Sequence, residues 1–150
     1  MCSLIMLSIL LAICCLGISK SEILDAVCYS DAHPLSDIHV DGSRTLSELQ
    51  HDAKAVLIIN TASFCAYTHQ YPGFNELQTE FGKDLAILGF PCNQFGLQEP
   101  GVGAEIRNTL RFVRPGGGYV PNFFLSQKIE VNGPKEHRLF AELKVDIEIF

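Results

Sequence analysis

The sequence contains no tryptophan and only two methionines among its 150 residues. It is also poor in positive charge: 11 Lys and Arg stand against 17 Asp and Glu, which gives a formal net charge of −6. The basic residues are scattered singly, and this excludes the basic footprint of a nucleic-acid or anionic-membrane surface. Internal repeats and low-complexity tracts are absent too. With 47% apolar residues, the length fits one globular domain with a buried core.

Charge is missing altogether from an apolar run near the N-terminus, residues 4–18. A run of this length fits the core of a secretory signal peptide and falls short of the ~20 residues that span a bilayer. We therefore expect residues 1–19 to be a signal peptide and residues 20–150 to be the domain of a secreted, extracellular protein. An uncleaved membrane anchor is the alternative, and the run has no Lys or Arg ahead of it.

Signal cleavage would leave three cysteines in the mature chain: Cys28, Cys65 and Cys92. Three thiols cannot all pair within one chain, so at least one is free or pairs with another molecule. In an oxidising compartment a free thiol points to redox chemistry. We expect Cys92, at the end of a strand, to be packed in the core.

Two continuous apolar runs, residues 55–60 and 85–90, predict central strands buried on both faces. Between them, apolar residues at helical spacing predict a helix over 74–81, which makes a βαβ unit with a parallel sheet. The fold class is therefore α/β. Further helices are predicted at 104–113 and 135–144, a short helical turn or an ordering loop at 45–49, and short strands at 123–125 and 128–131.

Cys65 lies between the first buried strand and the helix that follows it. Unpaired backbone N–H groups and the positive end of the helix dipole favour a thiolate at such a turn. The thiolate is the nucleophilic form of cysteine. A buried structural cysteine is the alternative at this stage. Because Thr68 stands where a Cys-x-x-Cys motif has its second cysteine, oxidation must pass to an outside thiol or a distant cysteine.

Four ordered blocks resemble the glutathione peroxidase family. They are NTASFCAYT (60–68), GFPCNQFGLQEPG (89–101), RFVRPGGGYVPNF (111–123) and VNGPKEHRLF (131–140). Within that family, the apolar leader and the cysteine at position 65 make the chain similar to the cysteine-bearing members of the secreted, plasma-type branch. The resemblance implies a thioredoxin-like fold.

The resemblance implies an antioxidant enzyme that reduces hydrogen peroxide or organic hydroperoxides with glutathione as co-substrate, without a cofactor or metal. Cys65 would be the peroxidatic residue and Gln98 the catalytic glutamine, whose amide donates to the sulfur or the peroxide oxygen. Arg114 matches an arginine linked to glutathione binding. Thioredoxin-dependent relatives in this family carry a second, resolving cysteine in the helix that follows the Gln-Glu-Pro-Gly turn. Residues 102–113 contain no cysteine, and the resemblance therefore favours glutathione over thioredoxin as the reductant.

The family pattern also bears on assembly and completeness. The loop 115–118 is similar to one found in tetrameric members, so a homotetramer is implied, with no nucleic acid and no membrane contact after signal cleavage. The family completes its site with a downstream Trp-Asn pair, and this chain has no Trp. We expect the C-terminal strands and final helix of the fold to be missing. The alternative function is a non-catalytic or poorly folded truncated product of the same family that acts as a binding or thiol-sensing protein.

Overall fold

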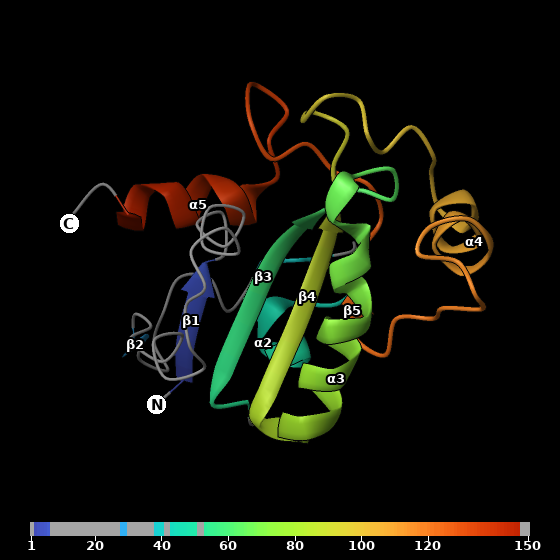
Figure 1. The fold of residues 1–150 in the computed structure, drawn as a ribbon. Coiled ribbons are helices and arrows are strands. Elements are labelled where there is room, and N and C mark those ends of the chain that lie inside the picture. The colour runs from blue at the N-terminus through green and yellow to red at the C-terminus, as the bar shows by residue number, and fades with distance from the viewer. Residues whose placement is uncertain (1, 7–27, 30–37, 41–42, 51–52, 148–150) are drawn as a thin grey trace.

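The computed structural model describes residues 2–6, 28–29, 38–40, 43–50 and 53–147. Within them lies a five-stranded sheet with the strand order β2-β1-β3-β4-β5 (Figure 1). Strand β2 is antiparallel to β1, and the remaining neighbours run parallel. The predicted parallel α/β architecture is therefore confirmed. The strands are β1 (Cys2–Met6), β2 (Cys28–Tyr29), β3 (Ala55–Thr61), β4 (Leu85–Pro91) and β5 (Phe124–Leu125).

The crossover between β3 and β4 is helical, as the sequence predicts. Pro72 lies in the first turn of its main helix, where no backbone N–H is needed, and Gly82 ends that helix with a φ of 53°. The two strands then pair in register from Ala55 opposite Leu85 to Thr61 opposite Pro91. The helices are α2 (Leu46–Gln50), η2 (Ala66–Gln70), α3 (Tyr71–Phe81), η3 (Gly82–Asp84), α4 (Ala104–Phe112) and α5 (Arg138–Ile147).

Strand β3 is buried on both faces because alternate side chains enter two separate cores. Val56 and Ile58 pack on one face with residues of α2 and α5. Leu57 and Ile59 pack on the other face with residues of α3 and α4. Figure 1 shows α3 running alongside β4, on the side of that strand away from β3. The absence of polar alternation in this strand follows from the double burial.

The predicted signal peptide lies largely outside the described residues, apart from β1. The backbone of β1 pairs with β3 from Ser3 opposite Ala55 to Met6 opposite Ile58. Signal cleavage stays a prediction, and a chain cut after Ser19 would no longer carry this strand. In the part of the chain that the structure describes, no helix combines the length and apolar character needed to cross a membrane.

The strand predicted at 128–131 is wrong. The Ile129 N–H donates to the Pro91 carbonyl at 3.0 Å, and the Val131 N–H donates to Oε1 of Gln94 at 2.9 Å. At Val131 a side chain thus takes the place of a neighbouring strand as the hydrogen-bond partner, and the contact of Ile129 with β4 is a single hydrogen bond. Val131 is nevertheless buried in the core. The alternating pattern therefore reflects which side chains are buried, and it does not indicate membership of a sheet.

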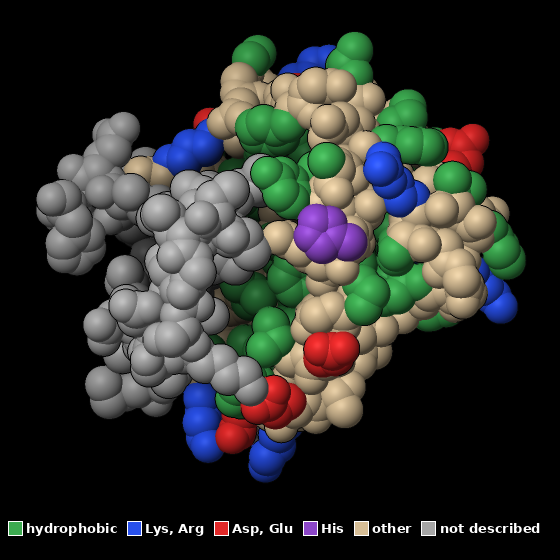
Figure 2. Space-filling view, in the orientation of Figure 1, with side chains coloured by type: hydrophobic (Ala, Val, Ile, Leu, Met, Phe, Trp, Pro, Cys, Tyr) green, Lys and Arg blue, Asp and Glu red, His purple; other side chains and the backbone are tan. Residues whose placement is uncertain are grey.

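The positively charged side chains are scattered on the surface, as they are along the sequence. On the face drawn in Figure 2 the Lys and Arg side chains lie in separate places, with other surface between them. Apolar side chains also reach the surface there, which is ordinary for a small folded domain.

Candidate active site at Cys65

Cys65 stands where the chain leaves β3 and enters helical structure. Its backbone is extended, with φ −64° and ψ 147°, and it caps η2, which runs without a break into α3. The Thr68 N–H donates to the Cys65 carbonyl at 3.3 Å and so closes the first turn. The predicted strand-to-helix position is thus observed, with a 3₁₀ turn preceding the α-helix. The Cys65 side chain is half-buried and free of any disulfide, so a small electrophile can reach it.

The loop that carries Gln98 is joined to the loop that carries Cys65. The Phe64 N–H donates to the Gln98 carbonyl at 3.0 Å. Next to it, Leu97 has a φ of 55°, a conformation that is unusual for a residue other than glycine. Such strain is kept where the surrounding structure fixes it, often at functional sites. The backbone of Gln98 is therefore hydrogen-bonded to the residue that precedes the predicted nucleophile, and Gln98 is half-buried.

A buried carboxyl group fastens the same two loops. Oε2 of Glu99 accepts the Ser63 N–H at 2.7 Å, and Oε1 accepts the Ser63 hydroxyl at 2.6 Å. Both residues are fully buried, with 0% exposed surface. Behind them, the Glu99 N–H donates to Oδ1 of Asn93 at 2.9 Å, and Lys128 donates to the Glu99 carbonyl at 3.2 Å. The segment from Ser63 to Cys65 is thereby fixed against the loop of Gln98.

Arg114 reaches the site from the far end of α4. Its Nη1 donates to the Phe64 carbonyl at 3.2 Å, so the guanidinium lies beside the residue that precedes Cys65. The side chain is otherwise exposed, and a guanidinium has five N–H donors. Donors remain for an anionic ligand that approaches Cys65. Bidentate binding of carboxylates is a common use of such a group.

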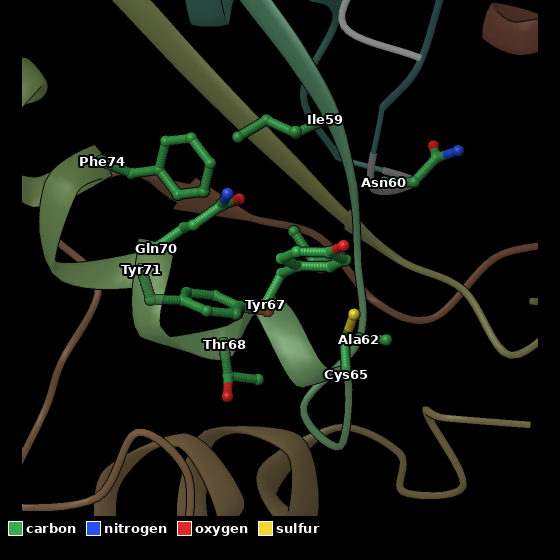
Figure 3. A pocket seen from close by; sticks show the side chains of 10 residues that line it. Ile59, Asn60, Ala62, Cys65, Tyr67, Thr68, Gln70, Tyr71 and Phe74 are labelled. Atoms are coloured by element: carbon green, nitrogen blue, oxygen red, sulfur yellow. The ribbon is translucent and has the colours of Figure 1, made fainter. Parts of the chain in front are cut away.

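A cavity of about 60 Å³ lies between the end of β3 and the helical segment that follows Cys65. Its wall is mostly apolar, and Cys65 forms part of it (Figure 3). Thr61 and Tyr71 also line it, but their hydroxyl oxygens are buried away from solvent. Burial raises the pKa of Tyr71 above its usual range.

The structure brings together the loops of all three predicted site residues, Cys65, Gln98 and Arg114. The roles of these residues remain predictions. Cys92 is only 1% exposed and packs in the core, as expected. Among the described residues, no group of His, Cys, Asp and Glu side chains is arranged to hold a metal ion.

Sequence reasoning missed Ser63, Glu99 and Tyr71. Glu99 offered one usable signal, because it is the only acidic residue in the block 89–101. Neither its burial nor its partner could be found from spacing, since the two residues lie 36 positions apart in the chain. Tyr71 gave no signal beyond its place at the start of a helix.

Residues 33–144 match the family model described as glutathione peroxidase. The chain belongs to the glutathione peroxidase family. This confirms the resemblance stated above and, together with the parallel sheet, the thioredoxin-like fold. The match includes the loops of Cys65, Gln98 and Arg114.

The relatives of this chain include a glutathione peroxidase that is named as secretory. The epididymal secretory glutathione peroxidase of Sus scrofa is 48% identical over 124 residues, covering 78% of this chain and 56% of the relative. Glutathione peroxidase 3 of Rattus norvegicus is 50% identical over 106 residues, covering 70% and 47%. The chain thus spans about half the length of the curated relatives it matches. The crystal structure of Trgpx in apo form aligns with a TM-score of 0.49 at 30% identity, covering 75% of this chain and 64% of that one.

Proposed function

We propose that this chain reduces hydroperoxides with glutathione through Cys65. One observation carries the proposal: the half-buried free thiol at the strand-to-helix turn is directly flanked by the loops of Gln98 and Arg114. Family membership supports the same chemistry. No prosthetic group is needed, because sulfur and glutathione carry all the electrons.

The reaction proceeds in three balanced steps. First, the Cys65 thiolate attacks the terminal oxygen of the hydroperoxide. The S–O bond forms as the O–O bond breaks, sulfur loses two electrons, and the leaving oxygen takes a proton to give water or an alcohol. Next, the thiol of glutathione attacks the sulfenic acid and releases water, forming a mixed disulfide. A second glutathione then attacks that disulfide and releases glutathione disulfide and the Cys65 thiolate.

Gln98 and Arg114 have separate tasks in this scheme. The neutral amide of Gln98 donates a hydrogen bond toward the reacting sulfur or the leaving oxygen, where negative charge develops. The guanidinium of Arg114 binds a carboxylate of glutathione at the mouth of the site and directs its thiol toward Cys65.

Cys92 provides the matched control for testing the proposal, because it is a free thiol buried in the core. Glutathione-dependent consumption of hydrogen peroxide should be lost in Cys65→Ser and retained in Cys92→Ala. A mass shift for sulfenic acid, trapped on Cys65 after exposure to peroxide, should accompany the activity. If the folded wild-type chain consumes no peroxide while Cys65 still reacts with other thiol reagents, a thiol-sensing role replaces the enzymatic one.

Secretion and tetramer formation belong to the same proposal. The uncharged run 4–18 supports export, and the name of the Sus scrofa relative describes a secretory protein. The loop 115–118 carries exposed glycines at its tip, where a neighbouring subunit could pack. N-terminal sequencing of the exported protein tests cleavage after Ser19. Sedimentation of the purified chain, with a variant that lacks the loop 115–118, tests the tetramer.

A further inference from the structure

Strand β3 has a neighbouring strand on each of its two edges. On one side, β4 pairs with β3 along the whole strand. On the other side, β1 pairs with β3 in parallel, from Ser3 opposite Ala55 to Met6 opposite Ile58 (Figure 1). Strand β1 lies within the predicted signal peptide, residues 1–19, which is called the leader below. This second edge, the outer edge of β3, is therefore covered by a segment that signal cleavage would remove.

The outer edge of β3 has no charge or proline to keep other strands away. Natural edge strands are commonly protected by charged side chains, prolines or bulges. Strand β3 has the sequence AVLIINT, which contains neither a charged residue nor a proline. Lys54, which precedes the strand, is held in an ion pair with Asp84 at 2.8 Å. Once β1 is removed, the backbone groups that pointed to it lose their partners, and nothing in the strand itself prevents a new strand from pairing there.

The side chains along this edge are apolar on both faces of the sheet. Val56 and Ile58 are buried in one core, and Leu57 and Ile59 are buried in the other. Because successive side chains of a strand point to opposite faces, an open edge along these residues exposes both cores to water. An added strand would cover this apolar surface and form main-chain hydrogen bonds at the same time.

A second copy of β3 suits this edge because each copy then offers the other the same open strand. Antiparallel pairing about a two-fold axis at Leu57 places Val56 of one copy opposite Ile58 of the other. In this register the paired side chains lie on the same face of the joined sheet, so apolar residues meet apolar residues. The stretch that pairs, residues 55–59, is one residue longer than the stretch that β1 occupies.

We propose that the outer edge of β3 is a strand-acceptor site. Strand β1 fills it within the uncut chain, and β3 of a second copy fills it once the leader is removed or detached. Cleavage after Ser19 thus exchanges a strand pair within one chain for a strand pair between two chains. This surface goes beyond the proposed function and takes no part in the chemistry of Cys65, so the peroxide assay and the test of this site succeed or fail separately.

The test keeps the full chain and detaches β1 by substitution. Successive N–H groups of a strand point to opposite neighbours, so a variant with both Leu4→Pro and Ile5→Pro loses the donor toward β3, whichever residue supplies it. Its mass in sedimentation equilibrium should rise about twofold over that of the wild type, as two copies pair. In hydrogen exchange, the amides of residues 55–59 should become more protected as the concentration of the variant increases, because the second copy restores their hydrogen bonds.

A variant with Leu11→Pro and Ala12→Pro is the matched control, because it places the same two prolines in the leader but outside β1. It should keep the mass of the wild type, and its amides at 55–59 should be protected equally at every concentration. A detached variant that keeps the wild-type mass overturns the proposal. So does a rise in mass without added protection at 55–59, because association then uses another surface.

Protection of the amides in β4 shows whether the detached variant still folds, since β4 pairs with the other edge of β3. If that protection is lost, Ser3→Pro replaces the double variant, because it alters only the first position of the pairing between β1 and β3. Ser3→Pro should give the same rise in mass and the same concentration-dependent protection to a smaller extent. Wild-type behaviour of the folded Ser3→Pro chain in both measurements overturns the proposal.

Discussion

The carboxyl group of Glu99 accepts both the N–H and the hydroxyl of Ser63, at 2.7 and 2.6 Å, in a fully buried environment. Ser63 lies two positions before Cys65, and Glu99 directly follows Gln98. Together with the bond from the Phe64 N–H to the Gln98 carbonyl, Glu99 therefore holds the loop of the nucleophile against the loop of the amide donor. Replacing either partner leaves buried polar groups without partners, which costs more than the hydrogen bond itself contributes.

Glu99→Ala should lower the free energy of unfolding by about 3 kcal/mol, because the Ser63 N–H and hydroxyl both lose their acceptor. Glu99→Gln should lose much less, since the Ser63 hydroxyl can accept from the new amide while its N–H still donates to oxygen. Urea denaturation measures both. Glu130→Ala, at an exposed glutamate, should stay within about 0.5 kcal/mol of wild type. An equally stable Glu99→Ala would show that the buried pair does not fix these loops.

Gln98→Ala should slow the oxidation of Cys65 by hydrogen peroxide by about 10- to 100-fold, because it removes a donor to the developing charge. The Gln98 carbonyl that accepts the Phe64 N–H belongs to the backbone and survives the substitution, so the loop should stay in place. Stopped-flow measurement of the oxidation rate checks this. Gln127→Ala alters an exposed amide and should have no effect. An unchanged rate in Gln98→Ala would assign the residue to the loop structure alone.

Arg114→Ala should raise the KM for glutathione by about 5- to 10-fold, as expected for the loss of one exposed charge-assisted contact. The rate of Cys65 oxidation by peroxide, which needs no glutathione, should be within about twofold of wild type. Steady-state kinetics and single-turnover oxidation separate the two effects. Arg111→Ala is the control, because that guanidinium lies over the exposed Phe112 ring on the same helix. A KM shift of the same size in both variants would contradict a specific glutathione contact.

Stability should fall as the pH drops from about 7 to about 5 because of His137. Burial lowers the pKa of His137, while a hydrogen bond to the His39 backbone opposes the shift. The unfolded chain therefore binds the proton more readily, so this contribution is present above the unfolded pKa and is lost on acidification. In the protonated ring Nδ1 carries a hydrogen and can no longer accept the hydrogen bond from the Leu139 N–H, at 3.2 Å, near the start of α5. Denaturation at several pH values, compared with His137→Gln, measures the slope, and an identical slope in the variant would refute the assignment.

The helices and buried strands could be predicted because their signals are local. The apolar run at 55–60 reads directly as a strand with two buried faces, and the helical spacing at 74–81 reads as its crossover. The same reasoning failed at 128–131, where alternating burial suggested a strand. There the side chain of Gln94 supplies the hydrogen bonds that a neighbouring strand would have supplied. No local pattern encodes such a long-range substitution.

By itself, the sequence determined the α/β class, the position of Cys65 at a strand-to-helix turn, and the family, because periodicity and motif order are properties of neighbouring residues. Only the tertiary structure decided that Glu99 meets Ser63 and that Arg114 reaches the carbonyl of the residue before Cys65. These two hydrogen-bonded contacts join residues 36 and 50 positions apart. Chain folding, and not residue type, determines whether such groups are buried together, paired or left without a partner.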